Sequence, residues 1–158
     1  MPKIVIVYDS KTGNTEAMAR SIAEGARSIS NTEVVFEKLG KSFSFSIFGD
    51  ADAVMFGSPS HHGHVTPEML VFLAELSDAI DSGVVNVEDK IGLAFGSYGW
   101  DSGVCIEKLS DEMLKLGFKM DQGVLAKPEP NADPSANPDI FRDCREAGKN
   151  LAKKIQTL

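Results

Sequence analysis

Five short segments of the chain are rich in β-branched and other apolar residues, a composition typical of β-strands. They are residues 3–8 (KIVIVY), 33–39 (EVVFEKL), 53–58 (AVMFGS), 90–97 (KIGLAFGS) and, with a weaker pattern, 119–126 (KMDQGVLA). The first, third and fourth segments are almost continuously apolar, as a parallel strand covered on both faces must be. The pattern therefore predicts five strands, of which these three are buried on both sides.

Between the strands, apolar residues recur at every third or fourth position, as they do along one face of an α-helix. Four segments show this spacing clearly, 18–29, 69–80, 106–116 and 144–155, and residues 44–49 show it weakly. Strands and helices thus alternate along the chain, which predicts an α/β fold with a doubly wound parallel sheet in a three-layer αβα sandwich. The proline-rich segment 127–138 is interpreted as the connection to the last helix.

Composition and charge narrow the class of protein. A chain of 158 residues with 42% apolar composition has the size of one domain, so we expect a single unit over residues 1–158. The N-terminus lacks the layout of a signal peptide and no run of about 18 apolar residues occurs, so we expect a cytoplasmic protein without membrane contact. The net charge of −7 disfavours nucleic acid as a partner. Cys105 and Cys144 lack metal-ligand spacing and are expected to be buried, reduced thiols.

The loop after the first strand reads Ser10-Lys11-Thr12-Gly13-Asn14-Thr15. We expect the chain to turn at Gly13 and a helix to begin near Asn14, so that free backbone N–H groups form an anion site. Three hydroxyls and an amide add hydrogen-bond donors, whereas Lys11 alone supplies positive charge, and this set favours a single phosphate. Helix capping alone would need only one of these polar residues. The P-loop and Rossmann glycine patterns are absent.

The loop after the third strand, residues 57–66 (GSPSHHGHVT), contains all three histidines. Thr66 as a cap and Pro67 at the first helical position predict the start of the next helix. No cysteine or carboxylate lies at a customary ligand spacing from these histidines, so no metal site is predicted. An imidazole there could lie against an aromatic ligand and make a redox potential depend on pH, or it could simply be solvated.

The loop after the fourth strand, residues 97–103 (SYGWDSG), holds the only tryptophan and one of the two tyrosines. This loop is expected at the carboxyl edge of the sheet, where ligands of open α/β folds bind. Exposed aromatic rings are costly there unless a flat ligand covers them. A tricyclic isoalloxazine would match Tyr98 and Trp100, unless one ring fills the core and the other lies on the surface.

These motifs together resemble the flavodoxin family. Its first loop has the form Ser/Thr-x-Thr-Gly-Asn-Thr, which residues 10–15 match, and grips the phosphate of FMN. The third loop is most similar to the flavodoxin domain of flavodiiron proteins, where Ser/Ala-Tyr-Gly-Trp frames the flavin, and the second loop looks more like that of flavodoxin-like quinone reductases. The resemblance spans the whole chain and implies a short-chain flavodoxin with FMN as cofactor and five parallel strands in the order 2-1-3-4-5.

The resemblance implies cofactor-binding residues in all three loops, and neither catalytic residues nor metal ligands. The implied FMN-binding residues are Ser10, Lys11, Thr12, Gly13, Asn14, Thr15, Pro59, Ser60, His61, His62, Gly63, Ser97, Tyr98, Gly99, Trp100, Asp101 and Gly103. In many short flavodoxins a second-loop peptide before a glycine flips on reduction to bond flavin N5. That position aligns here with His61-His62, which leaves the flipping peptide open.

The implied function is a low-potential one-electron carrier, in which FMN cycles between semiquinone and hydroquinone forms. The acidity of the chain, with Asp101 beside the expected ring site, should disfavour the fully reduced anion and so lower the potential of that couple. The implied partners are redox proteins that dock at the flavin edge, and the carrier is expected to be a monomer. Because the metal-binding domain of flavodiiron proteins lies outside these residues, we do not expect oxygen reduction.

Two alternatives stay open at this point. The first is an NAD(P)H-dependent FMN quinone reductase, which the second loop supports, although such enzymes usually form tetramers of longer chains. The second is a response-regulator receiver domain, which has an acidic residue after its first strand and Lys-Pro after its fifth, as Asp9 and Lys127-Pro128 are here. A receiver also needs an aspartate at the end of the third strand, where this chain has Gly57 and Ser58.

Overall fold

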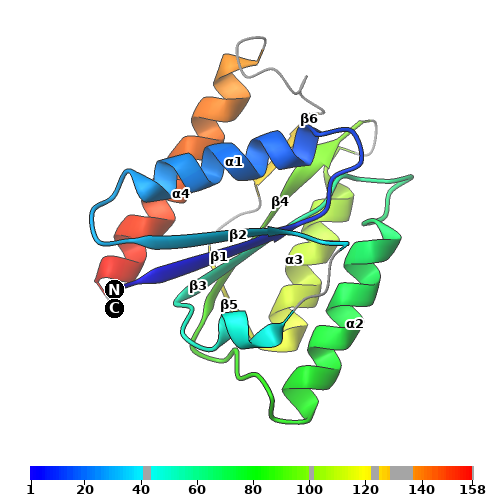
Figure 1. The fold of residues 1–158 in the computed structure, drawn as a ribbon. Helices are drawn as coiled ribbons and strands as arrows, with labels where there is room; N and C mark the ends of the chain where they lie inside the picture. The colour runs from blue at the N-terminus through cyan, green and yellow to red at the C-terminus, as the bar shows by residue number, and fades with distance from the viewer. Residues whose placement is uncertain (41–43, 100–101, 122–124, 129–136, 158) are drawn as a thin grey trace.

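A twisted parallel sheet runs through the molecule, with helices against both of its faces (Figure 1). The computed structural model describes residues 1–40, 44–99, 102–121, 125–128 and 137–157. The strands lie in the spatial order β2-β1-β3-β4-β5, and a further segment, β6, also pairs with β4. Their bounds are β1 Lys3–Tyr8, β2 Glu33–Lys38, β3 Ala53–Gly57, β4 Ile91–Tyr98, β5 Lys119–Met120 and β6 Leu125–Pro128. The predicted α/β class and the strand order are confirmed.

Burial follows the apolar pattern of the strands. Every residue of β1 and of β3 is buried, as a strand covered on both faces requires. Successive side chains point to opposite faces: Ile4 and Ile6 join one core cluster, whereas Val5 and Val7 join the other. β2 lies at the edge of the sheet and is half exposed, which matches its charged residues.

Two pairs of helices complete the three layers. One core contains apolar residues of α1 (Asn14–Arg27) and α4 (Pro138–Gln156), and the other contains those of α2 (Pro67–Asp81) and α3 (Val104–Leu116). The short 3₁₀ helix η1 (Phe45–Phe48), for which the sequence pattern was weak, adds Phe48 to the second core. All four predicted α-helices are thus present, each with its apolar face on the sheet.

Glycines allow α1 and α4 to cross in close contact. A Cβ built on Gly148 would lie 2.0 Å from the carbonyl oxygen of Ile22, and one built on Gly25 would lie 1.9 Å from that of Arg145. Real Cβ atoms cannot approach so closely, so the two backbones meet only because these positions carry no side chain. The long helix α4 is thereby fixed across α1 (Figure 1).

The fifth strand differs from its prediction. We expected one strand over residues 119–126, whereas β5 and β6 are separate segments that both pair with β4. β5 pairs at Gly92↔Met120 and β6 begins at Phe95↔Leu125, so the fifth strand uses more residues than β4 between the two pairings. The two segments therefore cannot share one continuous register.

Smaller features agree with the sequence analysis. Cys105 and Cys144 are buried free thiols, as predicted. Helix α1 ends at Arg27, two residues before the predicted Ile29, because Ser28 takes the cap position. Among the described residues, no helix combines the length and the apolar composition that crossing a membrane requires.

Candidate functional site

The three loops singled out in the sequence meet at the carboxyl edge of the sheet. The first follows β1, the second follows β3 and the third follows β4, and these three strands are neighbours. Backbone bonds tie them together, since Asp9 N–H donates to the Gly57 carbonyl at 2.9 Å and Ser60 N–H donates to the Ser97 carbonyl at 2.8 Å. The edge is therefore one connected surface and matches the place where open α/β sheets bind ligands.

The first loop wraps around the hydroxyl of Ser10. Its Oγ accepts the backbone N–H of Gly13 at 3.1 Å and that of Glu16 at 3.3 Å, while Gly13 takes the left-handed conformation with φ 92°. Ser10 thus satisfies two backbone N–H groups at the start of α1, whose N-cap residue is Gly13, and its own hydroxyl proton has no acceptor among the described residues. The Ser10 N–H is not free for a ligand, since it donates to Asp9 Oδ1 at 2.9 Å.

The start of α1 presents several unused donors. The backbone N–H groups of Thr12, Asn14 and Thr15 have no acceptor within the part of the chain that the structure describes. Thr12 is exposed, and the hydroxyl of Thr15 is buried and lies 3.1 Å from the hydroxyl of Ser97. This donor set at the N-terminus of a helix suits an oxyanion such as a phosphate.

Lys11 is directed toward carboxylates. Its Nζ lies 2.7 Å from Glu68 Oε1 and 3.7 Å from Asp9 Oδ2. The hydrogen bond to Glu68 is the main reason why the pKa of Lys11 is raised. Sequence reasoning missed Glu68, although its position in the first turn of α2, after the predicted cap Thr66, offered a signal. With Lys11 paired in this way, a phosphate on this loop would be held mainly by neutral donors.

Asp9 is the one polar side chain of the loop whose burial is not fully compensated. Its side chain is nearly inaccessible, and Oδ2 has no hydrogen-bond partner among the described residues. The ion-pair contact with Lys11 Nζ offsets part of the cost of burying this carboxylate. Asp9 therefore stabilises the loop through the hydrogen bond at Oδ1 and the ion pair with Lys11. Because its carboxylate would repel an anionic ligand, we do not expect Asp9 to contact one directly.

The second loop is a small hairpin that closes on itself. His61 N–H donates to the His64 carbonyl at 2.6 Å, and His64 N–H donates to the His61 carbonyl at 3.0 Å. His62 and Gly63 between them both have positive φ, 52° and 80°, as in a type I′ turn. The rings of His61 and His62 are exposed and stack with centroids 5.5 Å apart. Pro59 and Ser60, also predicted site residues, lie half-buried at the base of this loop.

The third loop leaves the sheet at Tyr98. Ser97 is buried, Tyr98 is half-buried and Gly99 is exposed. A Cβ built on Gly99 would meet no described residue within 4 Å, so the part of the chain that the structure describes leaves space beside it. Gly103, with φ 85°, caps α3, while the predicted ring contacts Trp100 and Asp101 lie outside the described residues.

Comparison with known proteins identifies this arrangement. The family model described as Flavodoxin matches residues 6–141. The chain belongs to the flavodoxin family. A flavodoxin from Aquifex aeolicus is 28% identical over 171 residues, which cover 98% of this chain and 88% of that protein. The solved structure of a flavodoxin from the domain Archaea superposes with a TM-score of 0.82 at 28% identity and covers 98% of this chain and 99% of its own.

Larger redox proteins are relatives as well. A nitric oxide reductase from Moorella thermoacetica is 31% identical over 156 residues, which cover 97% of this chain but 36% of that protein. The chain spans only about a third of the length of several of the curated relatives it matches. Membership of the flavodoxin family excludes the receiver-domain alternative, and β3 indeed ends at Gly57 with no aspartate there.

FMN is the cofactor of this family and so of this chain. The described residues fit its phosphate: hydroxyls and unused N–H groups converge at the start of α1, and the nearby Lys11 is held by carboxylates. They also leave room for a flat ring, because Gly63 and Gly99 both border open space.

Proposed function

We propose that the chain is an FMN-dependent, low-potential one-electron carrier that shuttles electrons between redox proteins. The observation that carries this proposal is the junction of the first and third loops at the Thr15–Ser97 hydroxyl pair, which supports a site where the donors proposed for the phosphate lie beside the loop of Tyr98. Bound FMN supplies the redox chemistry, since its ring accepts and releases electrons singly. The chain supplies binding, orientation and electrostatics.

The phosphate end would be held by the first loop. Ser10, Thr12 and Thr15 offer hydroxyl donors, and the helix N-terminus at Asn14 and Thr15 adds backbone N–H groups. Gly13 lets the chain turn there, because its φ of 92° is a conformation that other residues adopt only with strain. Neutral donors of this kind hold an anion without placing a strong positive charge near the ring.

The ring end would lie between the second and third loops. We propose that Pro59, Ser60, His61, His62 and Gly63 border one side of the ring and that Ser97 to Gly103 border the other. The His61–His64 hairpin supports this placement, because it stands at the sheet edge and its side chains are exposed. A flat ring there would cover the exposed imidazoles of the second loop and the accessible part of Tyr98.

The charge of the protein would set the potential. Reduction adds negative charge to the ring, and the chain carries a net charge of −7. A negative protein disfavours further negative charge in a site of low dielectric constant, so the lower of the two potentials should be strongly negative. The same charge makes basic redox proteins the expected partners. We propose further that residues 1–158 act as one domain and as a monomer in the cytoplasm.

Spectroscopy of the purified protein tests this function. A yellow protein whose extracted chromophore is FMN, and whose redox titration shows two separate one-electron steps, would support the carrier. A colourless protein that fails to bind added FMN would contradict it. The remaining alternative, an NAD(P)H-dependent quinone reductase, is favoured by the second-loop sequence; steady-state oxidation of NADH by a quinone with the isolated protein would distinguish it from a carrier.

A further inference from the structure

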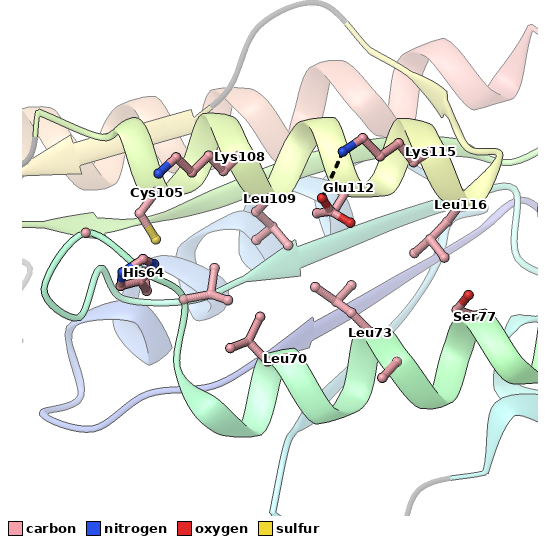
Figure 2. A pocket seen from close by; sticks show the side chains of 13 residues that line it. His64, Leu70, Leu73, Ser77, Cys105, Lys108, Leu109, Glu112, Lys115 and Leu116 are labelled. Atoms are coloured by element: carbon pink, nitrogen blue, oxygen red, sulfur yellow. Dashed lines mark hydrogen bonds and ion pairs between the residues drawn. The ribbon is translucent and has the colours of Figure 1, made fainter.

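The helices on the two faces of the sheet pack in different ways. α1 and α4 touch through their backbones at Gly25 and Gly148, whereas α2 and α3, which share a core, do not pack as closely along their length. Between α2 and α3 lies a groove with a volume of about 510 Å³ (Figure 2). One face of the sheet is therefore closed by helix contact, and the other has an open channel along its helices.

Apolar side chains from both helices form the walls of this groove. Leu70 and Leu73 project into it from α2, and Leu109 and Leu116 project from α3 (Figure 2). Ala74 of α2 also lines it. Leu70 is 55% exposed, although a leucine in a closed helix pair would be covered. The α2 residues recur at the third and fourth positions and so form an apolar stripe along that helix, which the apolar face of another helix could cover.

The two helices that border the groove are acidic as a whole, although the charged side chains that line the groove itself, Lys108, Glu112 and Lys115, all come from α3 and sum to +1. α2 carries four carboxylates and no lysine or arginine. Glu68 and Glu75 border a different hollow, beside Leu39 and Gly40, which leaves Asp78 and Asp81 as the other two. α3 carries three carboxylates and two lysines, one of which, Lys115, is paired with Glu112 at 3.2 Å. The two helices thus hold a net charge of −5 out of the chain's −7. A second copy of the chain would bring two such faces together against strong repulsion.

We propose that this groove binds an amphipathic helix of a partner protein, with an apolar stripe in the groove and lysine or arginine on the flank that faces α2. Such a helix would cover the apolar side chains that line the groove, and its basic flank would neutralise the acidic α2. The groove reaches His64 and Gly63 of the second loop, so the bound helix would anchor the partner next to the proposed ring site. The inference that the helix anchors a redox partner beside the ring rests on the proposed electron-carrier function, whereas the binding of a helix in the groove does not.

A synthetic peptide tests the groove directly. The probe is a fluorescent helical peptide of about four turns, with leucine at every third or fourth position and lysine elsewhere. Anisotropy should give a dissociation constant of about 1–100 μM at low salt, and binding should weaken as salt rises. A peptide of the same composition with its leucines scattered around the helix, and one with glutamate in place of lysine, should bind at least about tenfold more weakly.

Variants of exposed residues locate the binding site. Ala74→Arg puts a long side chain into the groove at a position where arginine suits a helix, and should weaken binding at least about tenfold. Asp78→Lys with Asp81→Lys should weaken it similarly and flatten its salt dependence. Glu24→Lys with Glu146→Lys changes the net charge by the same amount on the opposite helices, α1 and α4, and should leave binding within about twofold. Circular dichroism and thermal unfolding verify that each variant folds.

The outcomes separate the alternatives. Equal binding to Ala74→Arg, equal binding of the scattered peptide, or no binding by the unaltered protein would each overturn the proposal. So would sedimentation that shows a dimer dissolved by Ala74→Arg, because a second copy would then occupy the groove. FMN content is measured in every sample: a protein that binds the peptide in the groove but never FMN refutes the carrier and leaves this proposal standing, and the reverse result does the opposite.

Discussion

Thr15 and Ser97 share a hydrogen bond between their hydroxyl oxygens at 3.1 Å, although 82 positions separate them in the chain. Both side chains are almost completely buried. One belongs to the first turn of α1 and the other to the end of β4, so the bond links the loop expected at the phosphate to the loop expected at the ring. The geometry of the proposed FMN site therefore depends on this contact.

Replacing Thr15 with valine keeps the shape of the side chain and removes the hydroxyl. The buried Ser97 hydroxyl would lose its partner, so the free energy of unfolding should fall by about 1–3 kcal/mol. The affinity of the apoprotein for FMN should fall by about tenfold, because one phosphate donor is lost. Urea unfolding and FMN fluorescence quenching measure the two effects. Adding Ser97→Ala should restore part of the stability and none of the FMN affinity; FMN affinity unchanged by Thr15→Val would remove Thr15 from the phosphate site.

Replacing Glu68 with glutamine frees Lys11. The ion pair at 2.7 Å holds the Lys11 ammonium group, and Glu68 in turn has its pKa lowered mainly by the hydrogen bond from Lys11. Without the carboxylate, Lys11 can turn to the phosphate, so FMN should bind about two- to fivefold more tightly at low salt, and the gain should vanish at high salt. Glu75→Gln removes a charge from the same helix and is the control. Equal gains in both variants would show a general charge effect and not the release of Lys11.

Replacing Gly148 with alanine sets two effects against each other. Helix propensity alone would stabilise α4 by about 1 kcal/mol. The new Cβ would lie 2.0 Å from the backbone carbonyl oxygen of Ile22, which cannot move away without shifting α1. Overpacking of this kind costs about 1–3 kcal/mol or more, so we expect net destabilisation, measured by denaturant unfolding. Stabilisation by alanine would mean that α1 and α4 are not in backbone contact.

Replacing Tyr8 with phenylalanine removes the hydrogen bond from its hydroxyl to Glu16 Oε1 at 2.8 Å and keeps the ring stacked on Phe36. The free energy of unfolding at neutral pH should fall by about 1 kcal/mol. Burial, followed by the bond to Glu16, raises the pKa of Tyr8 above its ordinary value. The stability it contributes is therefore complete below the unfolded pKa of about 10 and is lost as pH rises beyond it.

The test of this prediction is the difference in unfolding free energy between the unaltered protein and Tyr8→Phe across pH 7 to about 11.5. The difference should shrink above about pH 10, and the groups that the two proteins share cancel in the comparison. A constant difference over that range would show that Tyr8 titrates alike in the folded and unfolded chains.

Much of the fold could be predicted because the buried strands are recognisable from their uninterrupted apolar sequences. β1 and β3 are apolar without interruption since helices cover both faces, and the alternation with amphipathic helices then leaves few possible architectures. The fifth strand was the exception, because its two segments pair with β4 in different registers and no local pattern records this.

The site was predictable only at the level of loops. The cluster of hydroxyls in the first loop indicated an anion site, but the sequence did not show which contact each residue makes. Ser10 accepts backbone N–H groups at the start of α1, Thr15 pairs with Ser97, and Lys11 pairs with Glu68. Each of these contacts joins residues brought together by folding. The tight turn at His62 was hidden as well, since its sequence has none of the asparagine or aspartate usual at such a turn.

The self-closed hairpin from His61 to His64 has a practical consequence for engineering. Its shape is maintained by two backbone hydrogen bonds and by the positive φ of His62 and Gly63, and the imidazole groups take no part in either. Positions 61 and 64 should accept many other side chains without any change in the path of the main chain. A small library of substitutions at these two positions would therefore vary the side chains at the carboxyl edge of the sheet while the backbone stays the same.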